Sequence, residues 1–504
     1  MKETAGDSGA PTVRARARGS SLMRDLLLYS LSKAAPAVMA LAAVSLLTNT
    51  LSPEQYGKFA LIVAFGRLGD SLGFGWLRQS TLRYYQELRE SVTSRSIVPL
   101  VGVLTGIVIG LQLIVSLVVL HFFQLGTVAI VIAALVPPCL TLFNLLATVL
   151  QARCEPKRFA AVAILQSTFY VVGLLALIHS GEASFLTAVL IFSGSYFIGA
   201  VSAVWWSGGL RSLREKKEKY WDRSIAGQLV SYGIPMSIWL VAFQFIFFSN
   251  RFIIQAFRSS GEVGIYSSAH EIFNGSVSLL MTPLLLAAHP IIMREWGVSR
   301  DLHSVEKIVG QCVRLLVVGG GAIVLAVLAG AGGLISSVLG KGFGVDKWVG
   351  SLLVLSAVLS QAGMYAHKGL ELAGNTGTMA RIAVTCVLIN LALTVGGLQL
   401  LGLLGVALAA VMTYMLYIVL SLVQSWRIVK IRISMSQMVK IIGVIAGLAG
   451  GVLYFSPEGG LGFIALGLCV MTYIVLMLAL GVLKTETQAL GTWMKEFRQR
   501  WIAP

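Results

Sequence analysis

Three charged side chains stand inside one long apolar stretch of the chain, where a charge is costly to bury. Arg67 and Asp70 are three residues apart, so on a helix they can pair. Arg78 follows Arg67 after about 1100° of helical rotation, within roughly 20° of the same face. Two guanidinium groups and one carboxylate leave a net positive charge, and guanidinium binds phosphate in a bidentate way. The pattern predicts a cationic cavity wall for an anionic group; the alternative is a neutralised structural pair with Arg78 reaching the aqueous edge.

Two further cations could belong to the same kind of site. Lys33 lies about one turn inside another apolar stretch, which also contains the helix-bending Pro36. It either lines a cavity or extends its ammonium group to the membrane edge. Arg251 follows a third apolar stretch, with Gln244 on the same helical face. We expect Arg251 to be a cationic ligand on the outer side of the membrane, or else an interfacial anchor.

A polar stripe marks a later apolar stretch, at spacings of four, three and four: Ser267, Glu271, Asn274 and Ser278. A polar stripe on a membrane helix faces protein or water. We therefore expect Glu271 and Asn274 to line a cavity, with hydrogen bonding between helices as the alternative. His270 lies beside the stripe and, like Asp70 and Glu271, could change protonation during a transport cycle. Lys368 and Glu371 are predicted to form a local salt bridge.

Catalytic and metal-binding patterns do not emerge from the sequence. Gly340-Lys341-Gly342 lacks the hydroxyl residue and the glycine spacing of a phosphate-binding loop. The five cysteines have no metal-ligand spacing and resemble small core residues. We therefore expect no enzyme activity, no catalytic residue, no cofactor and no metal site.

The elements that position these residues are membrane helices. Of 504 residues, 56% are hydrophobic and only 12% are charged, which excludes a soluble multidomain enzyme. The apolar runs are continuous rather than alternating, which excludes a β-barrel. Hydropathy predicts about 14 spans, near residues 26–48, 56–82, 97–120, 127–150, 159–179, 184–207, 228–250, 263–293, 308–339, 348–370, 378–400, 403–426, 438–455 and 461–483.

The net charge of +17 follows the predicted topology. About 30 of the 39 Lys and Arg residues fall in alternate loops and the two tails, and about four in the opposite loops. This bias predicts that both termini are cytoplasmic. The positive charge is therefore a topology signal, and we expect no nucleic-acid partner.

An internal repeat relates two helix starts. Ser52-Pro53-Glu54-Gln55-Tyr56-Gly57 and Ser260-Gly261-Glu262-Val263-Gly264 match when one gap is allowed, with Gly57 and Gly264 about 207 residues apart. Six spans separate them, so the two halves have the same orientation in the membrane. The predicted fold is an all-α polytopic membrane protein with two parallel six-helix lobes and an appended helix pair.

The predicted domain boundaries follow from the spans and from the polar stretches between them. They are a basic cytoplasmic tail over 1–25, an N-lobe over 26–207, a cytoplasmic linker over 208–227, a C-lobe over 228–426, spans 13 and 14 over 437–483, and a cytoplasmic tail over 484–504.

Four motifs resemble one family of exporters. They are the run from Leu51 to Ala60, the glycine-rich run from Asp70 to Leu77, Asn250-Arg251-Phe252-Ile253-Ile254, and the run from Glu262 to Ala269. Together they resemble the polysaccharide transporter branch of the multidrug/oligosaccharidyl-lipid/polysaccharide (MOP) exporter superfamily, which includes O-antigen flippases. That family commonly has Asp before the arginine, where this chain has Asn250.

The resemblance implies a two-lobe flippase of the bacterial inner membrane. By alternating access it would move an undecaprenyl-diphosphate-linked oligosaccharide for O-antigen, capsule or exopolysaccharide synthesis. Arg67, Arg78, Arg251 and Lys33 would bind the diphosphate, and spans 13 and 14 would hold the lipid tail. Its partners would be the lipid-linked substrate and membrane lipids, with a polymerase and chain-length machinery as further candidates. Two alternatives remain open: a cation-coupled drug antiporter of the same superfamily and a non-transporting scaffold of a glycan synthase.

Overall fold

The computed structural model describes residues 33–90, 97–121, 126–153, 155–207, 223–296, 302–431, 434–455 and 460–484. The predicted tail over 1–25 lies outside these residues, as do Cys154, most of the predicted linker over 208–227 and nearly all of the predicted tail over 484–504.

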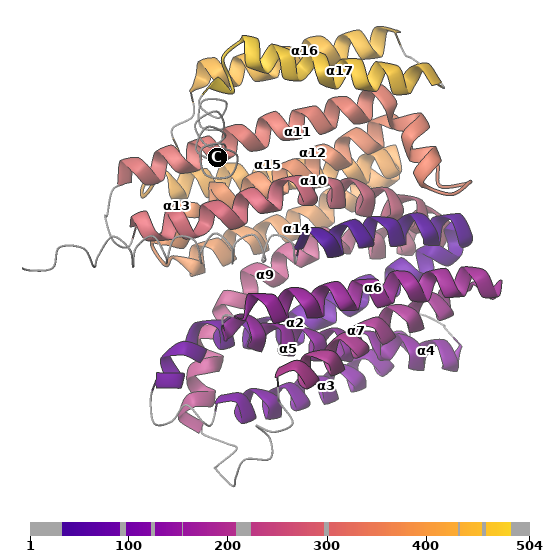
Figure 1. The fold of residues 1–504 in the computed structure, drawn as a ribbon, viewed down its shortest axis with the longest axis vertical. Helices are drawn as coiled ribbons and strands as arrows, with labels where there is room; N and C mark the ends of the chain where they lie inside the picture. The colour runs from indigo at the N-terminus through magenta and orange to yellow at the C-terminus, as the bar shows by residue number, and fades with distance from the viewer. Residues whose placement is uncertain are drawn as a thin grey trace, which may run out of the picture. The chain divides into compact units, whose positions relative to one another are not determined.

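The described chain is a succession of helices and contains no strand (Figure 1). The helices are residues 33–50, α2 (Pro53–Glu90), α3 (Ile97–His121), α4 (Thr127–Ala134), α5 (Val136–Ala152), α6 (Pro156–Ser180), α7 (Phe185–Ser207), α9 (Arg223–Phe257), α10 (Ser260–Arg294), α11 (Leu302–Val338), α12 (Lys347–Ala366), α13 (Lys368–Leu372), α14 (Thr376–Leu401), α15 (Leu403–Ser425), α16 (Met435–Phe455) and α17 (Gly460–Ala479).

Eleven helical segments of the described chain are long and apolar enough to cross a bilayer. They correspond to predicted spans 2 to 7 and 9 to 13. The other three predicted windows are occupied by the helix over 33–50, by α10 and by α17. The chain is therefore a multi-pass, all-α membrane protein, as the sequence predicts.

Predicted span 4 is divided into two helices. α4 ends at Ala134 and α5 begins at Val136, with Leu135 between them. The break lies next to Pro137 and Pro138, which lack the amide hydrogen that an uninterrupted helix needs. Proline is well suited to the first turn of α5, because those amides have no partner within the helix.

The internal repeat is visible in how two helices begin. The Ser52 hydroxyl accepts a hydrogen bond from the Gln55 amide at 3.3 Å, and the Ser259 hydroxyl accepts one from the Glu262 amide at 3.2 Å. Each serine therefore caps the helix that follows it, α2 or α10. Ser52 and Ser259 have the same sequence offset as Gly57 and Gly264. The two helix starts thus match without the gap that the sequence comparison allowed.

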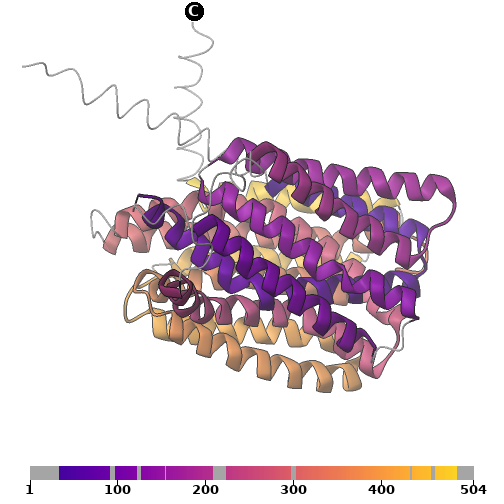
Figure 2. The same cartoon turned by 90° about the horizontal axis from the view of Figure 1, so that it is seen from below.

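The described residues fall into two compact units, Met1–Gly264 with Thr376–Val387, and Ile265–Asn375 with Leu388–Pro504. In the first unit α2 packs along both α9 and α5. Phe74 and Leu77 of α2 are buried with Leu100 of α3 and Leu229 of α9, and the helices of this unit run side by side (Figure 2). The predicted lobes over 26–207 and 228–426 stay a prediction.

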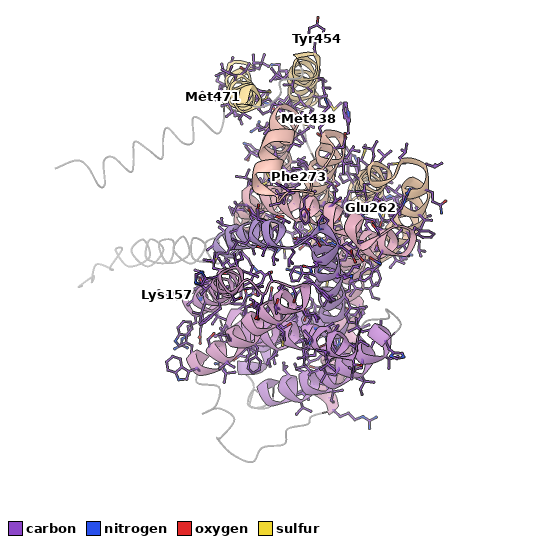
Figure 3. All side chains as sticks on the ribbon, turned by 90° about the vertical axis from the view of Figure 1, so that its right-hand side faces the viewer. Lys157, Glu262, Phe273, Met438, Tyr454 and Met471 are labelled. Atoms are coloured by element: carbon purple, nitrogen blue, oxygen red, sulfur yellow. The ribbon has the colours of Figure 1, made fainter. Side chains whose placement is uncertain are left out.

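In the second unit α11 packs against α12 on one side and against the α16–α17 pair on another (Figure 1). The Tyr473 hydroxyl of α17 donates a hydrogen bond to the Val318 carbonyl oxygen of α11 at 2.9 Å. Tyr454 and Met471 project away from this contact and are 84% and 62% exposed (Figure 3). The α16–α17 pair therefore buries the face that contacts α11 and exposes the opposite face, as expected of helices that face lipid.

Candidate functional site

Asp70 lies on α2 and is held by two side chains of α5. Thr141 Oγ1 donates a hydrogen bond to Asp70 Oδ1 at 2.9 Å, and Asn144 Nδ2 donates one to Asp70 Oδ2 at 2.7 Å. α5 can approach α2 this closely because Gly66 has no side chain: a Cβ atom there would collide with Val136 at the start of α5. The glycine at position 66 thus allows the close contact between α2 and α5, and this contact holds the Asp70 carboxylate in place.

A third helix joins this network through Gln112 of α3. Gln112 Nε2 donates to the Gly69 carbonyl oxygen at 3.0 Å and to Thr141 Oγ1 at 2.9 Å. Polar groups taken out of water cost free energy unless they are hydrogen-bonded, so these contacts tie α2, α3 and α5 together. Gln112, Thr141 and Asn144 are not among the predicted site residues. The available signal was their polarity inside apolar windows.

Two of the predicted cations, Arg67 and Arg78, lie near this carboxylate, and Lys33 lies near Arg78. The charges of Arg78 and Arg67 both act on Asp70, and the charge of Arg78 also acts on Lys33. The Lys33 ammonium also lies over the Phe159 ring, 5.5 Å from its centroid. Arg67 and Arg78 are partly exposed. The structure therefore brings Arg67 and Arg78 close to Asp70, and places the exposed Lys33 within reach of the Arg78 charge. Their role in binding an anionic ligand stays a prediction.

Arg251 has a different environment from the one predicted. The predicted span ends near residue 250, just before Arg251, but α9 continues to Phe257 because residues 252–257 are mostly apolar. The Arg251 side chain is only 2% exposed, and its guanidinium carbon lies 4.8 Å from the centroid of Phe248 and 5.8 Å from that of Phe247. In this conformation Arg251 is a buried cation packed on aromatic rings.

The predicted polar stripe lies on α10, in the second unit. Ser267 is buried, whereas Glu271 and Asn274 are partly exposed. His270 is nearly buried and stacks on Tyr266, with 5.7 Å between the ring centroids and 19° between the ring planes. The helical spacing of the stripe is as predicted, and the proposed roles of its residues stay predictions.

A second charged cluster lies in the same unit. Lys368 Nζ donates to Glu371 Oε2 at 2.6 Å, which confirms the predicted salt bridge. His289 Nδ1 of α10 lies 3.2 Å from Lys368 Nζ and 3.8 Å from Glu371 Oε1, a contact that the sequence spacing does not predict. The Lys368 side chain is 3% exposed, so it is a buried ammonium group with a carboxylate and an imidazole around it.

Metal and disulfide chemistry find no support in the described residues. No group of three or more His, Cys, Asp or Glu side chains among them could hold a metal ion. The cysteines that the structure describes, Cys139, Cys312, Cys386 and Cys469, form no disulfide.

Comparison with known proteins matches the first part of the chain to a family model. A family model described as "Polysaccharide biosynthesis protein" matches residues 22–296. None of the curated proteins is significantly similar in sequence.

Solved structures show the fold. The lipid II flippase MurJ, in an inward closed conformation, is 12% identical with a TM-score of 0.70, and the match covers 90% of this chain and 99% of MurJ. An inward-facing multidrug resistance MATE transporter of the MOP superfamily is 17% identical with a TM-score of 0.55, covering 80% and 94%. MATE in complex with MaL6 is 14% identical with a TM-score of 0.57, covering 80% and 95%. These likenesses confirm the predicted fold class.

Proposed function

Because this chain belongs to the polysaccharide biosynthesis protein family, we propose that it is a flippase for an undecaprenyl-diphosphate-linked oligosaccharide. It would act in the bacterial inner membrane, with both termini in the cytoplasm, and supply O-antigen, capsule or exopolysaccharide synthesis. A polymerase and chain-length machinery would use the product on the outer side.

The observation that carries the proposal is the charge group around Asp70. Positive side chains inside membrane helices are costly, so a group of them needs a reason. Asp70 accepts two hydrogen bonds from α5, and the charges of Arg67 and Arg78 both act on it. A diphosphate would suit this group, because guanidinium groups match its oxygen geometry.

Other parts of the substrate have different requirements. The oligosaccharide needs polar side chains, and Glu271 and Asn274 on α10, with His270 beside them, are proposed to line its path. The polyprenyl tail needs only lipid or an apolar groove, and the proposed place for it is beside α16 and α17. Arg251 is proposed to reach the diphosphate only in a conformation that opens its aromatic surroundings.

The likeness to MATE transporters favours one second candidate, a cation-coupled antiporter of small molecules. The environment of Asp70 argues against it, because Arg67 and Arg78 act on this carboxylate. A binding site for an organic cation would have an uncompensated carboxylate instead.

A reconstitution assay tests the proposal. Purified protein in liposomes receives a labelled undecaprenyl-diphosphate oligosaccharide, and a lectin reports how much glycan becomes accessible on the other side. We expect flipping by the wild type, a loss of at least about tenfold in Arg67→Ala and Arg78→Ala, and no change in Arg158→Ala. Arg158 is the matched control, because it is half-exposed and pairs with Glu155 on the surface of α6. Wild-type flipping by both variants would refute the site, and absence of flipping by the wild type would refute the function and leave the scaffold role.

A further inference from the structure

A pocket of about 130 Å³ lies in the first unit, apart from the Asp70 group. Its walls come from one face of α2, the end of α3, the end of α9 and the first residue of α10. The lining residues are Lys58, Leu61, Ile62, Phe65, Leu120, Phe252, Gln255 and Ser260. A single water needs only about 10–15 Å³, and a pocket with apolar walls holds water poorly. The space therefore suits several carbon atoms.

Polar and apolar groups are segregated in this pocket. The polar residues lie at one end, where α2 and α10 begin and α9 finishes: Lys58 is in the second turn of α2, and the Ser260 hydroxyl donates to Gln255 Oε1 at 2.9 Å. Further along α2 the wall is apolar, with Leu61 and Ile62 8% and 4% exposed. A ligand that fits would have a polar head and an apolar chain, which is the chemistry of a lipid.

The charges at the polar end identify the class of head group. Lys58 Nζ donates to Glu54 Oε1 at 2.8 Å, and both side chains are accessible, 38% and 66% exposed. A free phosphate or a diphosphate would gain from Lys58 but be repelled by Glu54. A head group with one phosphate and one ammonium group satisfies both side chains. A primary ammonium can donate hydrogen bonds to the carboxylate, whereas a quaternary ammonium cannot.

We propose that this pocket binds a membrane phospholipid with a phosphoethanolamine head group. Its phosphate pairs with Lys58, its ammonium with Glu54, and the upper part of one acyl chain lies against Leu61, Ile62 and Phe65. The site is distinct from the proposed substrate site, and its binding does not depend on transport.

The position of the pocket gives this lipid a structural consequence. Ser260 belongs both to the pocket wall and to the close contact of α2 with the start of α10, where a Cβ atom on Gly57 would strike the Ser260 carbonyl group. A lipid that touches Lys58 and Ser260 together bridges the two helices at that contact. Ligands that bind one conformation stabilise it, so the lipid should favour the state in which these helices meet.

Lipid binding to the full-length protein in detergent tests the proposal. Short-chain phosphatidylethanolamine, phosphatidylcholine, phosphatidylglycerol and inorganic phosphate are titrated separately, with thermal unfolding and native mass spectrometry as readouts. We expect phosphatidylethanolamine to bind at least about tenfold more tightly than the other three. Equal binding of the three lipids means non-selective surface lipid, and tightest binding of phosphate or phosphatidylglycerol means a simple anion site. Either result overturns the proposal.

Variants locate the site. Ile62→Trp fills the pocket and should abolish selective binding, and Phe65→Trp is a second filling variant in case the first does not fold. Leu72→Trp is the matched control on the same helix, since Leu72 is 54% exposed and outside the pocket. Glu54→Gln should shift preference towards phosphatidylglycerol. Selective binding that survives both filling variants, or an unchanged preference in Glu54→Gln, would overturn the assignment.

Discussion

Gly57 and Gly264 face one another across the contact between α2 and the start of α10. A Cβ atom on Gly57 would lie 3.0 Å from the Gly264 amide nitrogen, and one on Gly264 would lie 3.1 Å from the Gly57 amide nitrogen. The relation is reciprocal in a second way: Gly57 abuts the carbonyl oxygen of Ser260, and Gly264 that of Pro53. Pro53 and Ser260 have the same offset in sequence as the glycines. The contact therefore has the self-matching pattern of a two-fold axis, here within one chain.

This contact predicts that alanine is not tolerated at either glycine. Gly57→Ala or Gly264→Ala would place a methyl group against backbone, which cannot move aside as a side chain can. Although alanine favours helix by about 1 kcal/mol, we expect a net loss of about 1–3 kcal/mol in unfolding free energy. Thermal unfolding in detergent measures it. Gly261→Ala is the control on the same helix, because its nearest neighbour is the Ser259 hydroxyl at 3.7 Å. Equal stability of all three variants would contradict the prediction.

The hydrogen bonds of Asp70 predict how its neighbours respond to substitution. Thr141→Val keeps the shape of the side chain but removes the donor to Asp70 Oδ1, so a partly buried carboxylate loses a partner. We expect a loss of about 1–3 kcal/mol in unfolding free energy, while Thr141→Ser, which keeps the hydroxyl, should lose about 1 kcal/mol or less. Chemical denaturation of the purified variants measures both. If valine and serine were equivalent, the hydrogen bond would contribute nothing to stability.

The cluster of Lys368, Glu371 and His289 predicts an asymmetric response. Glu371→Gln leaves a buried ammonium group without its counter-charge, whereas Lys368→Met leaves a carboxylate that is 26% exposed. We therefore expect Glu371→Gln to lose more unfolding free energy than Lys368→Met, about 3–5 kcal/mol, and the double variant to recover part of this loss. The exposed pair Arg158–Glu155 is the control, and breaking it should cost less than about 1 kcal/mol. Additive losses in the cluster would show that these side chains are not coupled.

The helices and the repeat could be predicted from the sequence because each depends on local pattern. Continuous apolar runs define the spans, and the capping serines Ser52 and Ser259 mark the start of each repeat. Pro137 and Pro138 are also a local signal for the break between α4 and α5. The hydropathy pattern does not show this break, because both helices are apolar and together form one predicted span.

The partners of Asp70 could not be predicted in the same way. Thr141 and Asn144 are far from Asp70 in sequence, and they meet it because Gly66 of α2 lets α5 come close. Gln112 of α3 joins through Thr141 and the Gly69 carbonyl, next to Gly73 of α2. Charge spacing on one helix indicates which residues share a face. It does not indicate which helix covers that face or how that helix is rotated.

Arg251 is a second residue whose surroundings could not be predicted from its charge and spacing. Its charge suggested a ligand, but Phe247 and Phe248, four and three residues before it, already supply aromatic faces on its own helix. Lysine keeps the charge but not the planar group that stacks on rings, so Arg251→Lys should lower the unfolding temperature nearly as much as Arg251→Met. The partly exposed Arg67 should behave differently: Arg67→Ala should keep its stability and lose flipping. Parallel thermal unfolding and liposome flipping of the three variants separate the two roles. Full stability with lost flipping in Arg251→Met would contradict the structural role and leave only the proposed role of Arg251 as a substrate ligand.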